Sequence, residues 1–338
     1  MGKQVTIKDI ARKLRLSVST VSRALRNVPD INPSTKQLVL ETAAALNYEP
    51  NYIAQSRITR ETKMIGVIVP VISSDFFGKA LTGMNEIASS LGYHLLFCQS
   101  NESCETEIVN IRQLISCRVD GLLVSVSRET TDVSEFEKVI QKRIPLVFFD
   151  RAPTHIEASK VIVNQYDGAF RAVEHLIEMG CRRIAHLAGP AGLSISDERM
   201  KGYEDALRKN GLSPEDRYII RCDHFQDSAP GAIRQLLDLL PDLDGVFAVN
   251  DPLGISVIRQ LKAAGIRIPG DVAVVGFNDD PVSEVSEPAL STVMQPAYKV
   301  GKQAMEMLIR RIKDKSELPE TSLLNSHLII RSSSRRQN

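Results

Sequence analysis

The stretch Thr6-Ile-Lys-Asp-Ile-Ala-Arg-Lys-Leu-Arg-Leu-Ser-Val-Ser-Thr-Val-Ser-Arg-Ala-Leu25 decides how the first part of the chain folds. Ile7, Ile10 and Leu14 recur at helical spacing, which gives a first helix one apolar face. Ser17 suits the N-cap of a second helix, because its hydroxyl can accept a hydrogen bond from an otherwise unpaired N–H group. The stretch therefore predicts two short helices with a tight break between them.

The second of these helices has one apolar face and one small, polar face. Its inward positions are Val21, Ala24 and Leu25. Its outward positions are small or basic: Val18, Ser19, Ser22 and Arg23. Such a surface suits the DNA major groove, where bulk is excluded and guanine offers two acceptors to an arginine. An ordinary helical hairpin is the alternative, and the spacing by itself leaves both open.

Charge is distributed unevenly along the 338 residues, although the net charge is only +1. Residues 1–60 contain ten Lys/Arg and four Asp/Glu, a balance of +6, and the remainder contains 32 and 37, a balance of −5. The chain is too long for one typical domain. This asymmetry favours a basic nucleic-acid module joined to a mildly acidic body.

The sequence shows no signal for export or membrane insertion. No apolar run follows the N-terminal Met-Gly-Lys, and no apolar stretch approaches the ~20 residues that span a bilayer. The five cysteines are odd in number and form no C-x-x-C pair. We expect reduced thiols in a cytoplasmic protein, with no metal, no cofactor and no membrane partner.

The head continues beyond the first two helices. Asn32-Pro33 predicts the start of a third helix that runs to about Leu46, because asparagine caps a helix and proline fits its first position. Residues 50–58 would form a short helix only with a partner, since helix nucleation is costly. We therefore divide this part into a DNA-binding head over 1–49 and a hinge helix with linker over 50–63.

From Met64 onward, continuous apolar runs alternate with amphipathic stretches. This alternation predicts parallel sheets with helices on both faces. The runs are Ile65–Val71, His94–Cys98, Gly121–Val126, Leu146–Phe149, Val161–Val163, Ile184–Ala188, Tyr218–Cys222, Val246–Val249 and Val272–Val275. They are too many for one doubly wound unit of this length, so we expect two.

Two late elements would return the chain to both units: a helix over Tyr298–Ile312 and a strand over Leu323–Ile330. We place the first subdomain at about 64–162 with 297–323, and the second at about 163–294 with 324–332. Ligands of open α/β sheets bind in the crevice at the carboxyl ends of the strands, so we expect a binding cleft between the two.

Several motifs occur in an order that matches a known family. Val5–Leu25 carries the pattern V-T-I-x-D-I-A-x-x-x-x-x-S-x-x-T-V-S-R-x-L, and Tyr48–Ala54 reads Y-x-P-N-x-x-A. Further landmarks are Ile65–Pro70, Arg199-x-x-Gly202-Tyr203 and Pro288–Pro296. Over essentially its whole length, the sequence resembles the lactose-repressor (LacI/GalR) family of bacterial transcription regulators.

The resemblance implies an all-α helix-turn-helix head plus an α/β periplasmic-binding-protein-like body of two doubly wound parallel-sheet subdomains. It implies a homodimeric regulator, most simply a repressor, that binds a pseudo-palindromic operator under allosteric control of a small ligand. Whether the ligand releases or strengthens DNA binding is left open. The C-terminus lacks a leucine heptad, which favours a dimer over a tetramer.

By position in the family, three residues would read base edges: Val18, Ser19 and Arg23. Phosphate and backbone contacts would come from Thr6, Ser17, Thr20, Ser22 and Asn27. The hinge contacts would be Asn51, Ala54, Gln55, Arg57 and Ile58. The family usually carries a leucine wedge where Arg57 stands. Either Ile58 unstacks a base step through a one-residue shift, or Arg57 lines the minor groove, or Arg57 simply contacts phosphate.

The resemblance also implies a set of ligand-binding residues: Phe76, Phe77, Asn101, Asp150, Arg199, Phe225, Asn250, Asn278 and Gln295. Aromatic rings with Asp, Asn and Arg are typical of sugar recognition, because the ring stacks and the planar groups bond hydroxyls. A buried arginine suits a carboxylate or phosphate equally, and a nucleobase is the alternative ligand. Alternatively, each of these Asp or Asn side chains caps a turn at the end of a strand and does not contact a ligand.

An enzyme is the rival of a different class, because an α/β body can host catalysis. The sequence contains no G-x-x-x-x-G-K-[ST], G-x-G-x-x-G, H-E-x-x-H or G-x-S-x-G motif. Its six histidines do not pair at metal-ligand spacing. We therefore expect no catalytic residue and no enzymatic activity.

Overall fold

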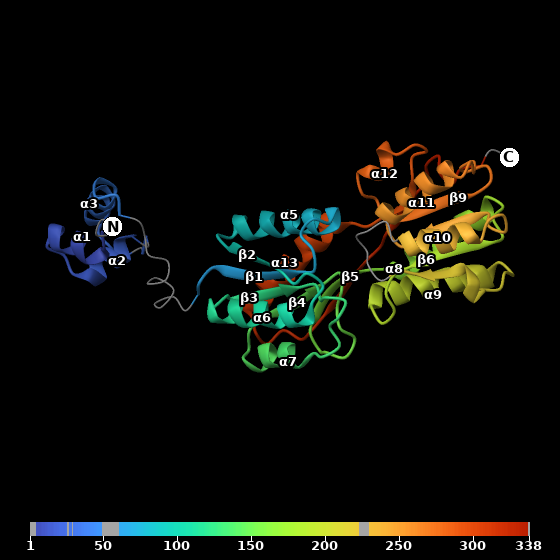
Figure 1. Ribbon diagram of the computed structural model, residues 1–338. Coiled ribbons are helices and arrows are strands. Elements are labelled where there is room, and N and C mark those ends of the chain that lie inside the picture. Colours follow the sequence, from blue (N-terminus) through green and yellow to red (C-terminus); the bar gives the residue numbers. More distant parts are fainter. Residues whose placement is uncertain (1–4, 26, 29, 49–60, 223–229, 337–338) are drawn as a thin grey trace. The chain divides into compact units, whose positions relative to one another are not determined.

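The computed structural model describes residues 5–25, 27–28, 30–48, 61–222 and 230–336. The chain divides into two compact units, Met1–Thr62 and Lys63–Asn338. We call the first unit the head and the second the body, and describe each by itself (Figure 1).

Three helices lie within the described residues of the head: α1 (Ile7–Leu14), α2 (Val18–Leu25) and α3 (Pro33–Ala45), as predicted. Its small core brings together one face of each helix: Ile10, Ala11, Val21, Ala24, Val39 and Ala43. Asn32 caps α3, because its side-chain oxygen accepts a hydrogen bond from the Ser34 N–H at 2.9 Å. Asn47 follows the helix with a φ of 46°, a left-handed conformation that asparagine tolerates.

The body begins with a six-stranded sheet built from β1 (Met64–Val69), β2 (His94–Gln99), β3 (Gly121–Val124), β4 (Leu146–Phe149), β5 (Ser159–Val163) and β11 (Thr321–Leu324). The strand order is β11-β5-β4-β3-β1-β2, and every neighbouring pair is parallel. Helices α5 (Asp75–Ser90) and α13 (Ala297–Lys313) pack on one face of this sheet. The other face is covered by α6 (Cys104–Ser116) and α7 (Ser134–Gln141). We call this layered unit the first lobe.

The second lobe repeats the arrangement with β6 (Ile184–Ala188), β7 (Ile219–Arg221), β8 (Gly245–Ala248), β9 (Ala273–Asn278), β10 (Ser291–Met294) and β12 (His327–Ile329). The order is β12-β10-β9-β8-β6-β7, and only β12 runs antiparallel to its neighbour. One face is covered by α8 (Gln165–Glu178) and α9 (Ser194–Lys209), the other by α10 (Pro230–Asp238) and α11 (Asp251–Ala263). A 3-10 turn, η1 (Asp216–Tyr218), and a short helix, α12 (Val282–Val285), complete the lobe.

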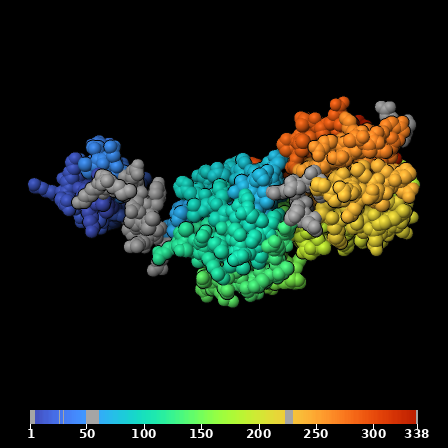
Figure 2. Space-filling view, viewed as in Figure 1, coloured from blue at the N-terminus to red at the C-terminus, as the bar shows by residue number. Residues whose placement is uncertain are grey.

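The chain passes between the lobes three times, from β5 to α8, from β10 to α13 and from β11 to β12. Helix α13 and strand β11 thus return the chain to the first lobe, as we expected for the late helix. Most of the visible surface of each lobe nevertheless comes from one continuous stretch, cyan to green in the first and yellow to orange in the second (Figure 2). In the part of the chain that the structure describes, no helix is long and apolar enough to cross a membrane.

Two strand predictions were wrong. The strand expected over Leu323–Ile330 is two strands, β11 in the first sheet and β12 in the second, and the boundary placed at 323/324 cuts β11. Strand β10 was missed, because it lacks an apolar run. Its fully buried Ser291 and Thr292 are instead satisfied by hydrogen bonds with distant segments, such as the one that Thr292 Oγ1 donates to Asp251 Oδ1 at 2.5 Å.

The first lobe depends on close contact between α5 and α13. A Cβ atom added at Gly301 would lie 1.8 Å from the carbonyl oxygen of Ala80, and one at Gly83 would lie 2.2 Å from that of Tyr298. These partners are backbone atoms, which cannot move away as a flexible side chain can. Glycine at these positions therefore sets the distance between the two helices.

We predict that Gly301→Ala lowers the free energy of unfolding by about 1–3 kcal/mol or more, the usual cost of overpacking. Gly78 lies on α5, and a Cβ atom added there would have no other atom within 4 Å, so Gly78→Ala should instead stabilise by about 0.4–1 kcal/mol. Denaturant unfolding of both variants measures the difference. Equal effects of the two changes would contradict the close-contact argument.

Candidate functional site

Helix α2 is held at its start by a cluster of hydroxyls. Ser17 Oγ accepts a hydrogen bond from the Thr20 N–H at 3.0 Å, so Ser17 is the N-cap that the sequence predicted. The same oxygen lies 2.7 Å from Ser19 Oγ and 2.8 Å from Thr20 Oγ1. The cluster fixes the first turn of α2 and leaves its hydroxyls at the surface.

The outward face of α2 carries the three predicted base-reading residues. Val18, Ser19 and Arg23 are exposed, whereas Val21 and Ala24 are buried in the head core. The guanidinium of Arg23 forms an ion pair with Asp30, and both side chains are about half exposed. An exposed ion pair contributes little, so Arg23 can exchange Asp30 for another acceptor at small cost.

The other predicted contacts of the head lie in defined positions. Thr6 precedes α1, where its N–H and Oγ1 both donate to Asp9 Oδ2, at 2.9 and 2.6 Å. Thr20 and Ser22 are half-buried on α2. Asn27 is exposed, has a φ of 59° and accepts a hydrogen bond from Lys36. The hinge residues Asn51, Ala54, Gln55, Arg57 and Ile58 lie outside the described residues, as does Phe225 of the ligand set.

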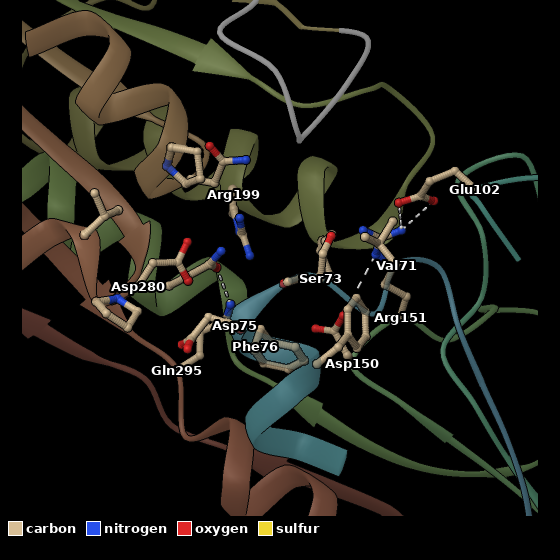
Figure 3. A pocket seen from close by; sticks show the side chains of 18 residues that line it. Val71, Ser73, Asp75, Phe76, Glu102, Asp150, Arg151, Arg199, Asp280 and Gln295 are labelled. Carbon is tan, nitrogen blue, oxygen red and sulfur yellow. Dashed lines mark hydrogen bonds and ion pairs between the residues drawn. The ribbon is translucent and has the colours of Figure 1, made fainter. Parts of the chain in front are cut away.

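The body contains a cavity of about 470 Å³, within the usual size range for small-ligand sites (Figure 3). Loops that follow β1, β4, β8 and β9 all contribute to it. The described residues that line it are Val71, Ser73, Ser74, Asp75, Phe76, Phe77, Glu102, Asp150, Arg151, Ile195, Arg199, Asn250, Pro252, Asn278, Asp280, Pro281, Val282 and Gln295. It thus lies at the carboxyl ends of the strands of both lobes, where open α/β sheets bind ligands.

Seven of the nine predicted ligand residues line this cavity: Phe76, Phe77, Asp150, Arg199, Asn250, Asn278 and Gln295. Asn101 does not belong to the described lining. It is exposed, and its side chain accepts a hydrogen bond from Gln99, while the next residue, Glu102, lines the cavity instead. Asn250 lines the cavity and also caps α11, because its Oδ1 accepts from the Leu253 N–H at 3.0 Å.

Arg199 is the most deeply held charge of the cavity, with only 3% of its surface exposed. Its Nε and Nη2 donate to Gln165 Oε1 at 2.9 and 2.8 Å, and its Nη1 donates to the Val249 carbonyl at 2.5 Å. Its guanidinium carbon lies 3.8 Å from the centre of the Phe277 ring. Burial lowers the pKa of Arg199 to about 9, which leaves it protonated at neutral pH.

Arg199 begins a chain of buried hydrogen bonds that sequence reasoning missed. Gln165 accepts from Arg199 and donates through Nε2 to Gln295 Oε1 at 2.8 Å. Gln295 in turn donates through Nε2 to Asn278 Oδ1 at 2.8 Å. Gln165 follows the crossover from β5, and Gln295 lies on the crossover from β10. The chain therefore ties the cavity to two of the three crossovers.

A second charged group faces the cavity from the first lobe. Arg151 Nη1 donates to both carboxylate oxygens of Glu102, at 2.9 and 2.8 Å. The neighbouring Asp150 is buried, and desolvation raises its pKa to about 6 against the opposing attraction of Arg151 and Arg199. The sequence placed Asp150 in the site and missed Glu102 and Arg151. The only available signal was that both follow strand ends.

Asp280 is a further acidic residue of the lining that the sequence analysis missed. No described residue gives its buried Oδ1 a hydrogen bond. Burial, followed by repulsion from Asp251 and Asp75, raises the pKa of Asp280 to about 7, with Lys79 opposing. Its oxygen is therefore an acceptor left for a ligand. Among the described residues, no group of three His, Cys, Asp or Glu side chains is arranged to hold a metal ion.

Comparison with known proteins gives a consistent result. Residues 6–51 match the model of bacterial regulatory proteins of the lacI family, and residues 173–334 match a periplasmic binding protein-like domain. The ribose operon repressor of Halalkalibacterium halodurans is 32% identical over 311 residues, which cover 92% of this chain and 91% of that protein. The chain belongs to the lacI family of bacterial regulatory proteins.

Solved structures agree with this assignment. The transcriptional regulator CelR in complex with cellobiose is 30% identical, with a TM-score of 0.75 over 98% of this chain and all of that one (100%). The lac repressor dimer bound to operator and an anti-inducer, at 23% identity, shows the same fold with a TM-score of 0.87 over 98% of this chain and 99% of that one. The predicted fold class, a helix-turn-helix head with a periplasmic-binding-protein-like body, is confirmed, and so is the identification as a DNA-binding transcriptional regulator.

We predict that stability depends on pH through Asp280. Its folded pKa of about 7 lies above the ordinary value of about 3.9, so its contribution is fully present below about pH 4 and is lost as the pH rises through 7. Asp280→Asn should therefore gain in melting temperature relative to the wild type between pH 5 and pH 8.

Asp132 provides the control for this measurement. Hydrogen bonds from the backbone and side chain of Ser134 lower the pKa of Asp132, so its titration falls below pH 4. The difference in melting temperature between Asp132→Asn and the wild type should stay constant from pH 5 to pH 8. If the difference in melting temperature between Asp280→Asn and the wild type is constant as well, the carboxyl of Asp280 does not titrate in this range.

Proposed function

We propose that this repressor binds a pseudo-palindromic operator as a homodimer, with Val18, Ser19 and Arg23 of α2 at the base edges. The observation that supports the DNA contact is the exposed face of α2, which is small except for one guanidinium. Arginine bonds the two major-groove acceptors of guanine, and the valine methyl groups suit a thymine methyl. Thr6, Ser17, Thr20, Ser22 and Asn27 would contact the phosphates beside them.

We divide the working chain into a reading head over 1–49, a hinge with linker over 50–63 and a ligand-binding and dimerisation body over 64–338. Asn51, Ala54, Gln55, Arg57 and Ile58 are proposed as the hinge contacts, with Arg57 or Ile58 at the wedge position. A regulator of bacterial DNA works in the cytoplasm, which is where we place it. It needs no catalytic residue for this role.

For the effector, the charge of the cavity favours a neutral polyol. Four carboxylates line it (Asp75, Glu102, Asp150 and Asp280), against two guanidinium groups. Both guanidinium groups already donate to protein acceptors, Arg151 to Glu102 and Arg199 to Gln165 and Val249. A phosphate or carboxylate would have to displace these acceptors and enter a site with excess negative charge. Hydroxyl groups, in contrast, supply a donor for Asp280, whose buried Oδ1 accepts no hydrogen bond from a described residue.

The aromatic side chains favour a sugar over a nucleobase. Phe76 and Phe77 are 6% and 4% exposed and meet edge to face, with ring centres 5.4 Å apart. Phe77 packs in the same manner on Phe149. Most of their surface is thus committed to the core, so they offer an apolar wall rather than two open faces for a flat base. The cellobiose complex of CelR and the ribose operon repressor fit this class of effector.

We infer that the effector acts on the crossovers through Arg199. A ligand that contacts Arg199 or Gln295 competes with the hydrogen bonds that join them to Gln165. Gln165 directly follows one crossover and Gln295 lies on another, so a change in these bonds changes the relative energies of the lobe arrangements. The free energy that the ligand contributes to one arrangement is available to favour or oppose DNA binding.

We predict that Arg23→Ala lowers affinity for an operator selected from random DNA by about five- to 150-fold, since a good bidentate base contact contributes about 1–3 kcal/mol. Affinity for scrambled DNA should fall much less. Arg12→Ala is the matched control, because Arg12 is an exposed arginine on α1. Fluorescence anisotropy measures the affinity of each variant, relative to the wild type, for the selected operator and for scrambled DNA. If Arg12→Ala and Arg23→Ala reduce specificity equally, Arg23 acts only through its charge.

We predict that a neutral sugar raises the melting temperature of the full-length protein and that its phosphate ester does not displace it from the effector cavity. At 100 times its dissociation constant, the sugar should stabilise by ~2.7 kcal/mol. A thermal-shift panel of neutral mono- and disaccharides identifies the sugar. Competition experiments then add its phosphorylated form or a purine to the complex with that sugar. Displacement of the neutral sugar by either competitor would overturn the assignment to neutral sugars.

A further inference from the structure

The first lobe contains a second cavity, of about 640 Å³, that the proposed DNA and effector sites do not use. It is lined by Ile140, Arg143, Ile144, Pro145, Leu146, Glu157, Ala158, Arg311, Lys315, Ser316 and Pro319. Leu146 begins β4, whereas Asp150 and Arg151 of the effector cavity follow its end. The two cavities therefore lie at opposite ends of the same strand.

Positive charge dominates the second cavity. Arg143, Arg311 and Lys315 line it, against the single carboxylate of Glu157. Within the part of the body that the structure describes, no carboxylate forms an ion pair with any of these three cations. No carboxylate of the described residues thus lies within ion-pair distance of these cations, whereas Arg151 of the effector cavity is paired with Glu102.

The hydrogen bonds of these cations leave donors available. Lys315 Nζ donates to the carbonyl of Arg143 at 3.2 Å, and Arg311 Nη1 donates to that of Glu317 at 3.0 Å. Arg311 Nε is buried and has no acceptor among the described residues. An unpaired buried donor costs free energy until an acceptor arrives. An anion in this cavity would supply both the acceptor and the missing negative charge.

The remaining wall of the cavity is apolar. Ile140 of α7, Ile144 and Pro145 of the loop before β4, and Pro319 contribute to it, with Leu146 and Ala158. A bare inorganic anion would leave this surface in contact with water. An organic group attached to the anion would cover it, which is favourable in proportion to the apolar area removed from water.

We propose that this cavity is a second ligand site, which takes a small organic anion such as a phosphate ester. Arginine and lysine hold phosphate oxygens through charge-assisted hydrogen bonds, and Arg311, Arg143 and Lys315 supply them here. The proposal does not depend on the identity of the effector, because the two cavities differ in lining and in sign of charge.

The test uses phenyl phosphate as the probe, titrated into the full-length protein by isothermal calorimetry. Phenyl phosphate should bind at least tenfold more tightly than inorganic phosphate, which lacks the ring, and than phenol, which lacks the charge. The double variant R143A/K315A should weaken the binding of phenyl phosphate at least tenfold. Arg311 is kept, since its bond to the Glu317 carbonyl holds the loop.

The double variant R182A/K201A is the matched control, because it removes one exposed arginine and one exposed lysine from the second lobe and so makes the same change in net charge. It should bind phenyl phosphate as the wild type does. Equal weakening in both variants would mean unspecific attraction, and unchanged binding in R143A/K315A would exclude the site. A loss of operator affinity in R143A/K315A with unchanged binding of phenyl phosphate would assign these cations to the DNA backbone and overturn the proposal.

Discussion

The buried guanidinium of Arg199 is a charge that the fold of the body has to accommodate. A charge removed from water has to be compensated by acceptors with good geometry. Gln165, the Val249 carbonyl and the Phe277 ring supply that compensation from three different segments. Because Gln165 then donates to Gln295, the groups that hold the charge are also groups on the crossovers. The ligand cavity and the connections between the lobes thus share one hydrogen-bond network.

This arrangement gives a physical basis for regulation by a small ligand. A ligand changes an equilibrium only by its difference in affinity for two states. In this body, side chains that line the cavity are connected to the crossovers through one or two hydrogen bonds. A ligand that contacts these side chains therefore has a different affinity for each arrangement of the two lobes. The acidic lining, with Asp280 unsatisfied, selects for donors, and hydroxyl groups are the neutral donors that a sugar offers.

The two cavities show how one sheet separates opposite charges. At the carboxyl end of β4, Asp150 and Arg151 face a cavity with excess negative charge. At its amino end, Arg143, Arg311 and Lys315 surround a cavity with excess positive charge. The four residues of β4 separate these ends. A ligand that suits the acidic cavity and an anion that suits the basic cavity can therefore bind the same lobe without competing.

Much of the secondary structure was predictable from the sequence, since strands and helix caps depend on local patterns. The apolar runs predicted β4 and β6 at their observed bounds, and Ser17 and Asn32 were predicted as caps and are caps. The residues of the effector cavity were harder to predict, because segments far apart in the sequence contribute them. Asn101 was carried over by position, but the chain turns at residues with φ of 55° and 61°, and it is Glu102 that lines the cavity and bonds Arg151.

The sequence by itself determined helices α1 to α3 and the two doubly wound lobes, because spacing, caps and apolar periodicity are properties of neighbouring residues. The order of the motifs along the chain indicated the family. Only the tertiary structure decided β10, the splitting of the last strand and the Arg199–Gln165–Gln295–Asn278 chain. Gln165 and Gln295 are 130 positions apart, and Ser291 N–H is satisfied by Ser333 Oγ, 42 positions away. Polar residues at such separations carry no local signature, since their partners exist only once the chain has folded.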